Sequence, residues 1–426
     1  MTAGAAQTVS LAVQVIALLL FLAGAVSFVL LLRGCFALRR LGRVSSRDDT
    51  LVLLKSAMVP QISVVYAAQD ALPETRKAVR LLIDLHSANH EVVLALHGVT
   101  PEVLEEWRRE FQLFETPRSV EARGVWEAQK PTRLVVLDLE PCSRAEALKT
   151  AVRASNGTFI GFIDPHAELN MEVLLRLLRP MLEQPDEVVA CCGTAPPVPK
   201  ASLAGRFAAI EMLRHWLTRG AAFASWNMVT PGPGWAVVVR REPLLNAAGA
   251  WERPMELVLN LHGHARAKRN KFKVAFLPHR VSTLPAAGDL KGLRELVRRD
   301  QRSIASAWRY AKQVSGGRRA IGWGLPALRA DRLWRPLLET LGYVLAIGGF
   351  AAGLVSWRVL VLFLLCTVAT GMLVSMAAVI LRELAEFQGS DPVELAGTFF
   401  SAIPENLGYR QLRNLWLIAG LWDKGD

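Results

Sequence analysis

The feature that most constrains this chain is residues 2–32, which contain no charged side chain. Their central part, LAVQVIALLLFLAGAVSFVLLL, is long enough to cross a hydrocarbon layer of about 30 Å. A cleaved signal peptide would have a shorter apolar part with basic residues before it, and this chain has neither feature. We therefore expect a retained transmembrane helix over residues 1–33.

Two further apolar stretches lie near the C-terminus. One covers about residues 340–357, the other covers residues 359–381, and Arg358 lies between them. A membrane-spanning segment must satisfy its backbone hydrogen bonds internally, so both stretches are expected to be helical. The sequence therefore predicts a transmembrane hairpin over residues 336–383.

Basic residues indicate how these helices are oriented. The chain has 50 Lys and Arg against 38 Asp and Glu. Several arginines follow the first apolar stretch, and no basic residue precedes it. The positive-inside rule then places the N-terminus outside and residues 34–57, a basic linker, in the cytoplasm. Because the hairpin crosses and returns, the C-terminus is also expected to be cytoplasmic.

The basic charge is explained by anionic lipid headgroups, which attract each nearby Lys or Arg by about 1 kcal/mol. We find no nucleic-acid-binding motif and expect no nucleic-acid partner. The lipid bilayer is the expected partner, in a multi-pass protein of the cell (inner) membrane. Five cysteines lack metal-site spacing and are interpreted as small buried residues: Cys35, Cys142, Cys191, Cys192 and Cys366.

Between the membrane segments, apolar strands alternate with amphipathic helices. Strands are expected at residues 60–68, 90–96, 132–139, 158–164 and 186–193, and helices at residues 72–88, 143–157 and 171–182. Gly157 is interpreted as a left-handed cap of the second helix. This alternation predicts an α/β domain, with a mostly parallel sheet and helices on both faces. In such sheets ligands bind beyond the carboxyl ends of the strands.

The chain divides further into an α/β half of nucleotide-sugar type over residues 58–200 and a less regular acceptor-side half over residues 201–330. Residues 392–426 are predicted to form an amphipathic tail in the membrane interface. Its apolar side chains are expected to face lipid, while its charged ones stay in water: Glu405, Arg410, Arg413 and Asp423.

Six segments, in this order, resemble processive family 2 glycosyltransferases with a GT-A fold, and most closely the membrane synthases of poly-N-acetylglucosamine and hyaluronan type. The segments are PQISVVYAAQD, SRAEALKTAVRASNGTFIGFIDPHAEL, GWAVVVRREPLLNAAGAW, MELVLNLHGH, FLPHRVSTLP with RRDQRSIASAW, and PENLGYRQLRNLW. The resemblance implies a GT-A-like domain inserted between one N-terminal and two C-terminal transmembrane helices. It also implies a nucleotide-sugar donor and, in an active enzyme, a divalent metal, Mg or Mn.

At the donor-binding positions the chain departs from this family. Asp70 stands where the family has Asn-Glu, and His97 stands in place of the carboxylate that binds uridine. Of the Asp-x-Asp that holds the metal, Asp164 is present and His166 replaces the second carboxylate. Histidine can bind metals, so Asp164 and His166 are the candidate metal ligands, although a polar loop residue is the simpler interpretation of His166.

The catalytic positions depart further. Arg253 and Pro254 align with the Glu-Asp of the family, so the position of the base is Pro254. Glu252 and Glu256 remain as candidate substitutes, and Glu256 matches a residue that we expect to be structural. Of the final Gln-x-x-Arg-Trp, the resemblance keeps Gln301 and Arg302 as donor-side residues, but Ile304 and Ala305 occupy the Arg-Trp positions.

Because these losses occur together, we interpret the chain as a catalytically degenerate member, a pseudoenzyme component of a polysaccharide synthesis or export system. Its expected partner is an active synthase or an export subunit. Two alternatives stay open. One is an active but divergent glycosyltransferase that passes a sugar from a nucleotide-sugar to a growing glycan. The other is a non-enzymatic membrane scaffold.

Overall fold

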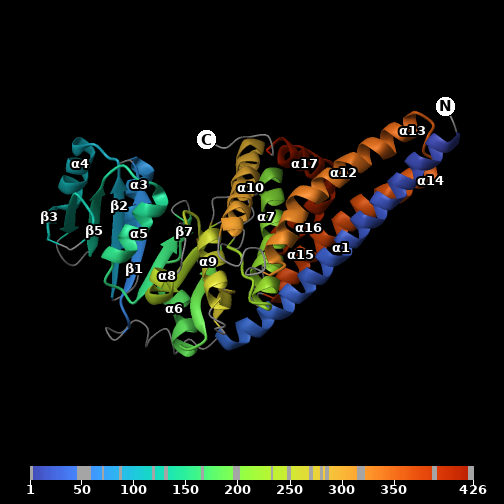
Figure 1. Cartoon of the computed structure of the whole chain (residues 1–426). Helices are drawn as coiled ribbons and strands as arrows, with labels where there is room; N and C mark the ends of the chain where they lie inside the picture. Colours follow the sequence, from blue (N-terminus) through green and yellow to red (C-terminus); the bar gives the residue numbers. More distant parts are fainter. Residues whose placement is uncertain are drawn as a thin grey trace.

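The structure is a computed structural model of the whole chain (Figure 1). It describes residues 3–45, 59–69, 72–85, 89–117, 120–128, 133–164, 167–194, 202–231, 234–246, 251–267, 272–278, 282–283, 287–313, 322–385 and 391–420. Of the candidate site residues, Asp70 and His166 lie outside these ranges.

A nine-stranded sheet forms one half of the molecule. Its strands in spatial order are β10 (Lys273–Leu277), β8 (Val188–Gly193), β9 (Ala236–Arg240), β6 (Phe159–Ile163), β1 (Ile62–Ala68), β2 (His90–His97), β5 (Leu134–Leu139), β4 (Gly124–Ala128) and β3 (Leu113–Glu115). Among these strands only β4 and β9 run against the others. The sheet is therefore mixed but mostly parallel, as the sequence predicts.

Helices cover both faces of this sheet (Figure 1). On one face, Ile62 and Val64 of β1 belong to a core shared with α3 (Pro73–Ile83), α4 (Pro101–Phe111) and α6 (Val173–Glu183). On the other face, Val65 and Ala67 belong to a core shared with α5 (Arg144–Ala154) and the π-helical η1 (Trp216–Ala222). Both faces of a central strand are buried, which explains its continuous apolar sequence.

The expected cap at Gly157 is wrong. Helix α5 ends at Ala154, and the residue that follows it, Ser155, is extended. Gly157 is instead needed for a close approach, because its N–H donates to the Ser63 hydroxyl at 2.8 Å and a Cβ there would lie 2.5 Å from that oxygen. The glycine thus lets the start of β6 lie against β1.

The remaining elements are mainly helical. They are α1 (Ala3–Ser45), α7 (Leu203–His215), α8 (Arg241–Asn246), α9 (Pro254–Ala267), α10 (Leu290–Gln313), α11 (Gly324–Arg329), η3 (Ala330–Trp334), α12 (Arg335–Tyr343), η4 (Val344–Gly348), α13 (Gly349–Ala351), α14 (Trp357–Leu364), η5 (Leu365–Ala369), α15 (Thr370–Ala385), α16 (Pro392–Pro404), η6 (Glu405–Tyr409) and α17 (Arg410–Ala419). Helices α8 and α9 pack against the sheet, and most of the other helices extend away from it (Figure 1). A small ribbon pairs β7 (Glu168–Leu169) with β11 (Ser282–Thr283).

Within the described residues, two helices are long and apolar enough to cross a membrane, Gly4–Leu41 and Trp357–Ala385. The expected third span corresponds to the second half of a continuous helical run over residues 324–351. That run is not among the two candidates, and its first half carries charges such as Asp331 and Arg332. Two described helices therefore have the length, apolar composition and low charge of a membrane span, one near each end of the chain.

Helix α1 continues beyond its apolar part into the residues expected to begin the basic linker. Leu31, Cys35 and Leu38 are buried in the same core as η1. Gly34 makes this contact close, because a Cβ there would overlap the carbonyl oxygen of Leu217. The second half of α1 therefore anchors the apolar helices directly to the α/β half.

Candidate functional site

A groove of about 620 Å³ lies where β1, β2 and β5 end. It is lined by Gln69, His97, Gly98, Pro141, Cys142 and Ser143. Gly98 has a φ of +68°, a conformation that glycine adopts without strain, and it turns the chain away from β2 at this edge. None of the described lining residues is acidic. The structure thus brings His97 to the edge of the sheet where the resemblance places the nucleotide.

His97 is buried, and its Nδ1 lies 3.0 Å from the carbonyl oxygen of Cys142. Nε2 of Gln69 lies 3.3 Å from the same Nδ1, so Nδ1 either donates to the carbonyl of Cys142 or accepts from Gln69, depending on the tautomer. Burial lowers the pKa of His97, and the hydrogen bond to Cys142 opposes that effect. The side chain is therefore a neutral polar group, unlike the carboxylate whose position it takes.

A second cavity lies between β1, β6 and the start of α9, where the resemblance places the catalytic carboxylates. Its volume is only about 30 Å³. The side chains around it include Trp235, Trp251, Arg253 and Pro254. Trp251 is 3% exposed and meets the ring of Phe162 edge-on at 5.0 Å. These large side chains fill the space beyond the two central strands.

Glu256 is engaged in holding its own helix. Its Oε2 accepts the backbone N–H of Glu252 at 2.8 Å and that of Arg253 at 3.3 Å, and its Oε1 accepts the hydroxyl of Ser306. The side chain is buried and closes the N-terminus of α9, where backbone N–H groups lack helical partners. Glu252 is exposed and lines the small cavity.

Asp164 follows β6 directly, as expected. It is half-buried, its N–H donates to the carbonyl of Trp235, and its Oδ2 accepts the N–H of Gly234 at 3.3 Å. In the described parts of the chain, no three His, Cys, Asp or Glu side chains lie together in a way that could hold a metal ion. With His166 outside these parts, the described donors do not form a metal site.

The Gln-Arg segment lies on α10 and contacts other elements. Gln301 donates to the carbonyl of Leu417 on α17 at 2.8 Å. The Arg302 side chain is exposed, while its backbone carbonyl accepts from the guanidinium of Arg253 at 3.0 Å. Trp308 is packed beside Ile304 and lies under the guanidinium of Arg329. Gln301 thus ties α10 to the C-terminal helices.

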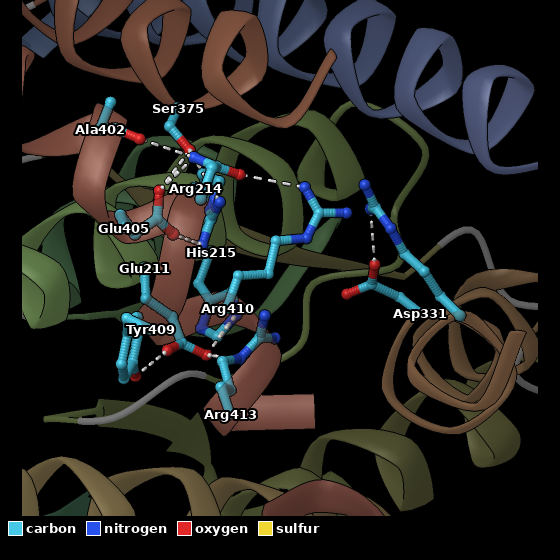
Figure 2. A network of polar contacts seen from close by, with 12 residues as sticks. Glu211, Arg214, His215, Asp331, Ser375, Ala402, Glu405, Tyr409, Arg410 and Arg413 are labelled. Carbon is cyan, nitrogen blue, oxygen red and sulfur yellow. Dashed lines mark hydrogen bonds and ion pairs between the residues drawn. The ribbon is translucent and has the colours of Figure 1, made fainter. Parts of the chain in front are cut away.

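An extensive network of polar contacts joins several helices (Figure 2). Tyr409 and Arg413 reach Glu211 on α7 at 3.1 and 3.0 Å. Glu405 accepts from Arg214 at 2.8 Å and from Ser375 at 2.6 Å. These side chains come from α7, α15, η6 and α17, so one network joins helices far apart in sequence.

The same network includes charged residues of η3, α12 and α10. Arg410 donates to Glu339 at 2.9 Å, and Arg332 lies 3.0 Å from Glu211 and 2.6 Å from Asp300. Arg219 pairs with Asp300 at 2.8 Å. We call this set the arginine network: Glu211, Arg214, Arg219, Asp300, Asp331, Arg332, Arg335, Glu339, Glu405, Arg410 and Arg413, with Ser375 and Tyr409 as hydrogen-bond partners.

The expectation that Glu405 and Arg410 stay in water is wrong, because they are only 1% and 7% exposed. The sequence had placed them in a recognisable C-terminal motif but not their partners Arg214 and Glu339. A usable signal was present: Arg214 and Glu339 each interrupt an apolar stretch, and a buried charge requires a partner.

The arginine network holds six arginines and five carboxylates, and these charges shift the pKa values of its members. Burial alone would raise the pKa of Glu211, but Arg413, Arg332 and Arg214 lower it to about 2. Burial and the charges of Arg219 and Arg332 lower the pKa of His215 well below its ordinary value. Its Nε2 accepts from Arg332, which requires a neutral ring.

Comparison with known proteins bears on the fold. Neither a family model nor a curated protein matches this sequence. Among solved structures, the mannosyltransferase PcManGT from Pyrobaculum calidifontis, in complex with GDP-Man and Mn²⁺, is similar over 97% of this chain and 100% of that chain, with 16% identity and a TM-score of 0.54.

Two other glycosyltransferases show weaker similarity. S. aureus TarS residues 1–349 matches over 82% of this chain and 91% of its own, at 14% identity and a TM-score of 0.35. Glucosyl-3-phosphoglycerate synthase of Mycobacterium tuberculosis matches over 61% and 81%, at 15% identity and a TM-score of 0.34. The chain therefore has a glycosyltransferase-like fold of the GT-A type, and this similarity concerns the fold alone.

Replacing Glu256 by Ala should lower the free energy of unfolding by about 1–3 kcal/mol, because it leaves the N–H groups of the α9 terminus without their acceptor. Glu252→Ala changes an exposed side chain just before α9 and should alter the free energy of unfolding by less than about 0.5 kcal/mol. Thermal unfolding of both variants in detergent checks this. Equal stability of the two would contradict the capping role.

Stability should fall between about pH 7 and pH 5, because unfolded histidine gains a proton there while His215 in the folded chain stays neutral. His215→Gln should flatten this part of the curve of stability against pH.

Glu211 acts at lower pH: its folded pKa of about 2 lies below the ordinary 4.5, so its contribution to stability is lost as pH falls from about 4.5 toward 2. Glu211→Gln should therefore flatten only the acid part. The free energy of unfolding of the wild type and both variants, measured across this pH range, checks these expectations. A curve left unchanged by His215→Gln would contradict the role assigned to His215.

Proposed function

We propose that this chain is an integral membrane protein with a glycosyltransferase fold that transfers no sugar and acts as a component of a polysaccharide synthesis or export system. The observation that carries the proposal is the 30 Å³ cavity beyond β1 and β6. Ligand pockets usually measure about 300–1,000 Å³, and 30 Å³ is about the volume of one water molecule. The space left by Trp235, Trp251, Arg253 and Pro254 is too small for a sugar.

The proposal is also supported by what the carboxylates near this cavity do. A transferase needs a carboxylate base within hydrogen-bond reach of the acceptor hydroxyl. Glu256 already accepts three hydrogen bonds that hold α9 and its neighbour α10. Arg253 and Pro254, at the position of the base in the resembling family, offer no proton acceptor on their side chains.

One observation favours the divergent enzyme as a second candidate. The groove at Gln69 and His97 is large enough for a nucleotide, and it lies at the strand ends where α/β sheets bind ligands. The mannosyltransferase similar in fold was solved with GDP-Man and Mn²⁺. In that case Asp164 and His166 would hold the metal, and Glu252, which is exposed beside the small cavity, would be the base.

Membrane insertion is supported by side chains that point away from the protein. On α1, Leu11, Val26 and Val29 are 60–62% exposed, and Leu373 on α15 is 64% exposed. In water, a continuous apolar surface of this kind costs about 25 cal/mol for each Å². A bilayer removes that cost.

The path of the chain supports a hairpin over residues 336–383. The turn after α13 lies beside the start of α1, since a Cβ on Gly349 would lie 3.3 Å from Val9. The chain then returns to the sheet half, where Tyr409 contacts Glu211. A crossing by α14 and α15 must be matched by one through α12 and α13, so three spans fit the contacts (Figure 1).

The tail fits a position in the membrane interface. Val393, Phe400, Leu407 and Leu415 are 54–79% exposed on α16, η6 and α17, while the opposite side joins the arginine network. A helix with one exposed apolar face and one polar, occupied face lies along a membrane surface.

The purified full chain should transfer no sugar from radiolabelled UDP- or GDP-sugars, including GDP-mannose, with Mg²⁺ or Mn²⁺. An active membrane synthase assayed in parallel serves as the positive control. Asp164→Ala should leave donor binding, measured by calorimetry, unchanged from wild type. Transfer above background, or metal-dependent binding abolished by Asp164→Ala, would establish the divergent enzyme instead.

Single-cysteine labelling in intact cells should place residue 2 outside and both residue 47 and residue 425 inside. The reason is that α1 crosses once and the hairpin crosses twice. The matched control is a cysteine at Ala352, in the turn of the hairpin, which should be labelled from outside. Labelling of residue 425 from outside would contradict the hairpin.

A further inference from the structure

A cavity of about 440 Å³ lies between α1 and the arginine network. One wall is apolar and comes from α1, with Leu19, Leu20, Ala23, Val26 and Leu30. The other wall is mainly basic, with five arginines against the two carboxylates Asp331 and Glu339: Arg214, Arg219, Arg335, Arg410 and Arg413. We call this space the arginine cavity. A cavity with one apolar and one basic wall is suited to an amphiphile that carries negative charge.

The charges around the arginine cavity are not balanced. In the arginine network, as far as the structure describes the chain, six arginines face five carboxylates, and His215 is neutral. Three buried donors that line the cavity have no hydrogen-bond acceptor in the described residues: Nη2 of Arg219, Nε of Arg413 and Nδ2 of Asn414. Nε of Arg413 is ion-paired with Glu211 at 3.0 Å, and Oε1 of Glu339 is a buried acceptor on the same wall without a donor among these residues. Arg219 and Asn414 are each 3% exposed. A buried donor without an acceptor is costly, so this wall calls for an anion.

The depth of the cavity agrees with a lipid headgroup. Ser375 of the network lies 18 residues after Trp357, the first residue of the second candidate span. At 1.5 Å per residue this is about 27 Å, close to the thickness of the hydrocarbon layer. The arginine network therefore lies at the inner boundary of the membrane, the level at which lipid phosphates are found.

The cavity also opens toward the bilayer. Val26 on α1 and Trp334 on η3 line it and are 60% and 59% exposed. Arg335 reaches across from α12 to Ser27 of α1 at 3.2 Å. Tryptophan favours the interfacial level of a membrane. An acyl chain can thus leave between α1 and η3 while its headgroup stays inside.

We propose that the arginine cavity binds the phosphate group of a membrane lipid. The phosphate oxygens accept from the free Nη2 of Arg219 and from Asn414, and the hydrocarbon chain lies along the apolar wall of α1. Arginine suits this role because its guanidinium matches phosphate geometry and stays charged. The inference rests on the membrane insertion proposed above. It adds a ligand that lies between α1 and the arginine network.

The test uses the full chain, purified in neutral detergent, stripped of lipid and then supplied with one of three probes. Phosphatidylglycerol should remain bound through washing and raise the melting temperature. Diacylglycerol, which has the chains without the phosphate, and inorganic phosphate, which has the charge without the chains, should do neither. Equal protection by inorganic phosphate would assign the site to free phosphate, and protection by no probe would overturn it.

Two variants locate the effect. Asn414→Asp, which places a carboxylate at the anion position, and Ala23→Phe, which fills the apolar wall, should each weaken phosphatidylglycerol binding about ten-fold or more. Leu11→Phe, exposed on α1 outside the cavity, is the control and should bind as wild type. Ala23→Phe keeps the test valid if Asn414→Asp does not fold. Wild-type binding by both variants would overturn the proposal.

Carbonate extraction of membranes separates this inference from the proposed function. A chain that resists extraction but retains no phosphatidylglycerol would refute the lipid site and leave membrane insertion standing. A chain released by carbonate would refute both.

Discussion

The arginine network is the interaction on which the rest of the architecture depends. It joins α7 and η1, the latter packed on the sheet, to η3, η6, α10 and α17 through buried ion pairs. The Arg410–Glu339 pair extends it to α12, and the Ser375 hydroxyl extends it to α15. Removing one partner of such a pair costs about 3–5 kcal/mol, because the other charge stays buried. Gly371 shows how tightly it is built, since a Cβ there would overlap Arg410 and Asn406. The relative position of the two halves is therefore fixed by charge as much as by apolar contact.

The sheet half keeps a glycosyltransferase-like frame while its central site is changed. The same strand ends that would present a donor sugar now border Trp251 and Pro254. Glu256 accepts backbone N–H groups at the start of α9, and Gln301 donates to a carbonyl of α17. Both residues lie in segments that resemble glycosyltransferase motifs. The core of the sheet and the chemistry at its edge depend on different residues, so the fold alone does not decide the chemistry.

The apolar helices and the arginine network form one unit. The second half of α1 is buried against η1, and its first half exposes apolar side chains. Between them, the arginine cavity meets both environments. A phosphate lipid bound there would neutralise the excess of arginine and would make the contact between α1 and the network sensitive to the lipids present.

The sequence by itself determined the local and patterned features. Charge-free length predicted the helices at both ends, and apolar runs predicted β1, β2, β5, β6 and β8 in their order. The order of six motifs predicted the fold class, and Asp164 was found at the end of β6 as expected. Each of these is written in neighbouring residues or in the order of segments, so a single chain reveals them.

Only the tertiary structure decided how distant residues meet. Glu211 and Arg413 lie about 200 positions apart, and nothing near either in the sequence names the other. The role of Gly157 was misjudged for the same reason, because Ser63, the group that requires it, lies on another strand. The small volume beside Trp251 and the arginine cavity are likewise spaces between elements. Cavities and long-range ion pairs depend on how the helices pack against one another and against the sheet. The local periodicity of the sequence does not encode that packing.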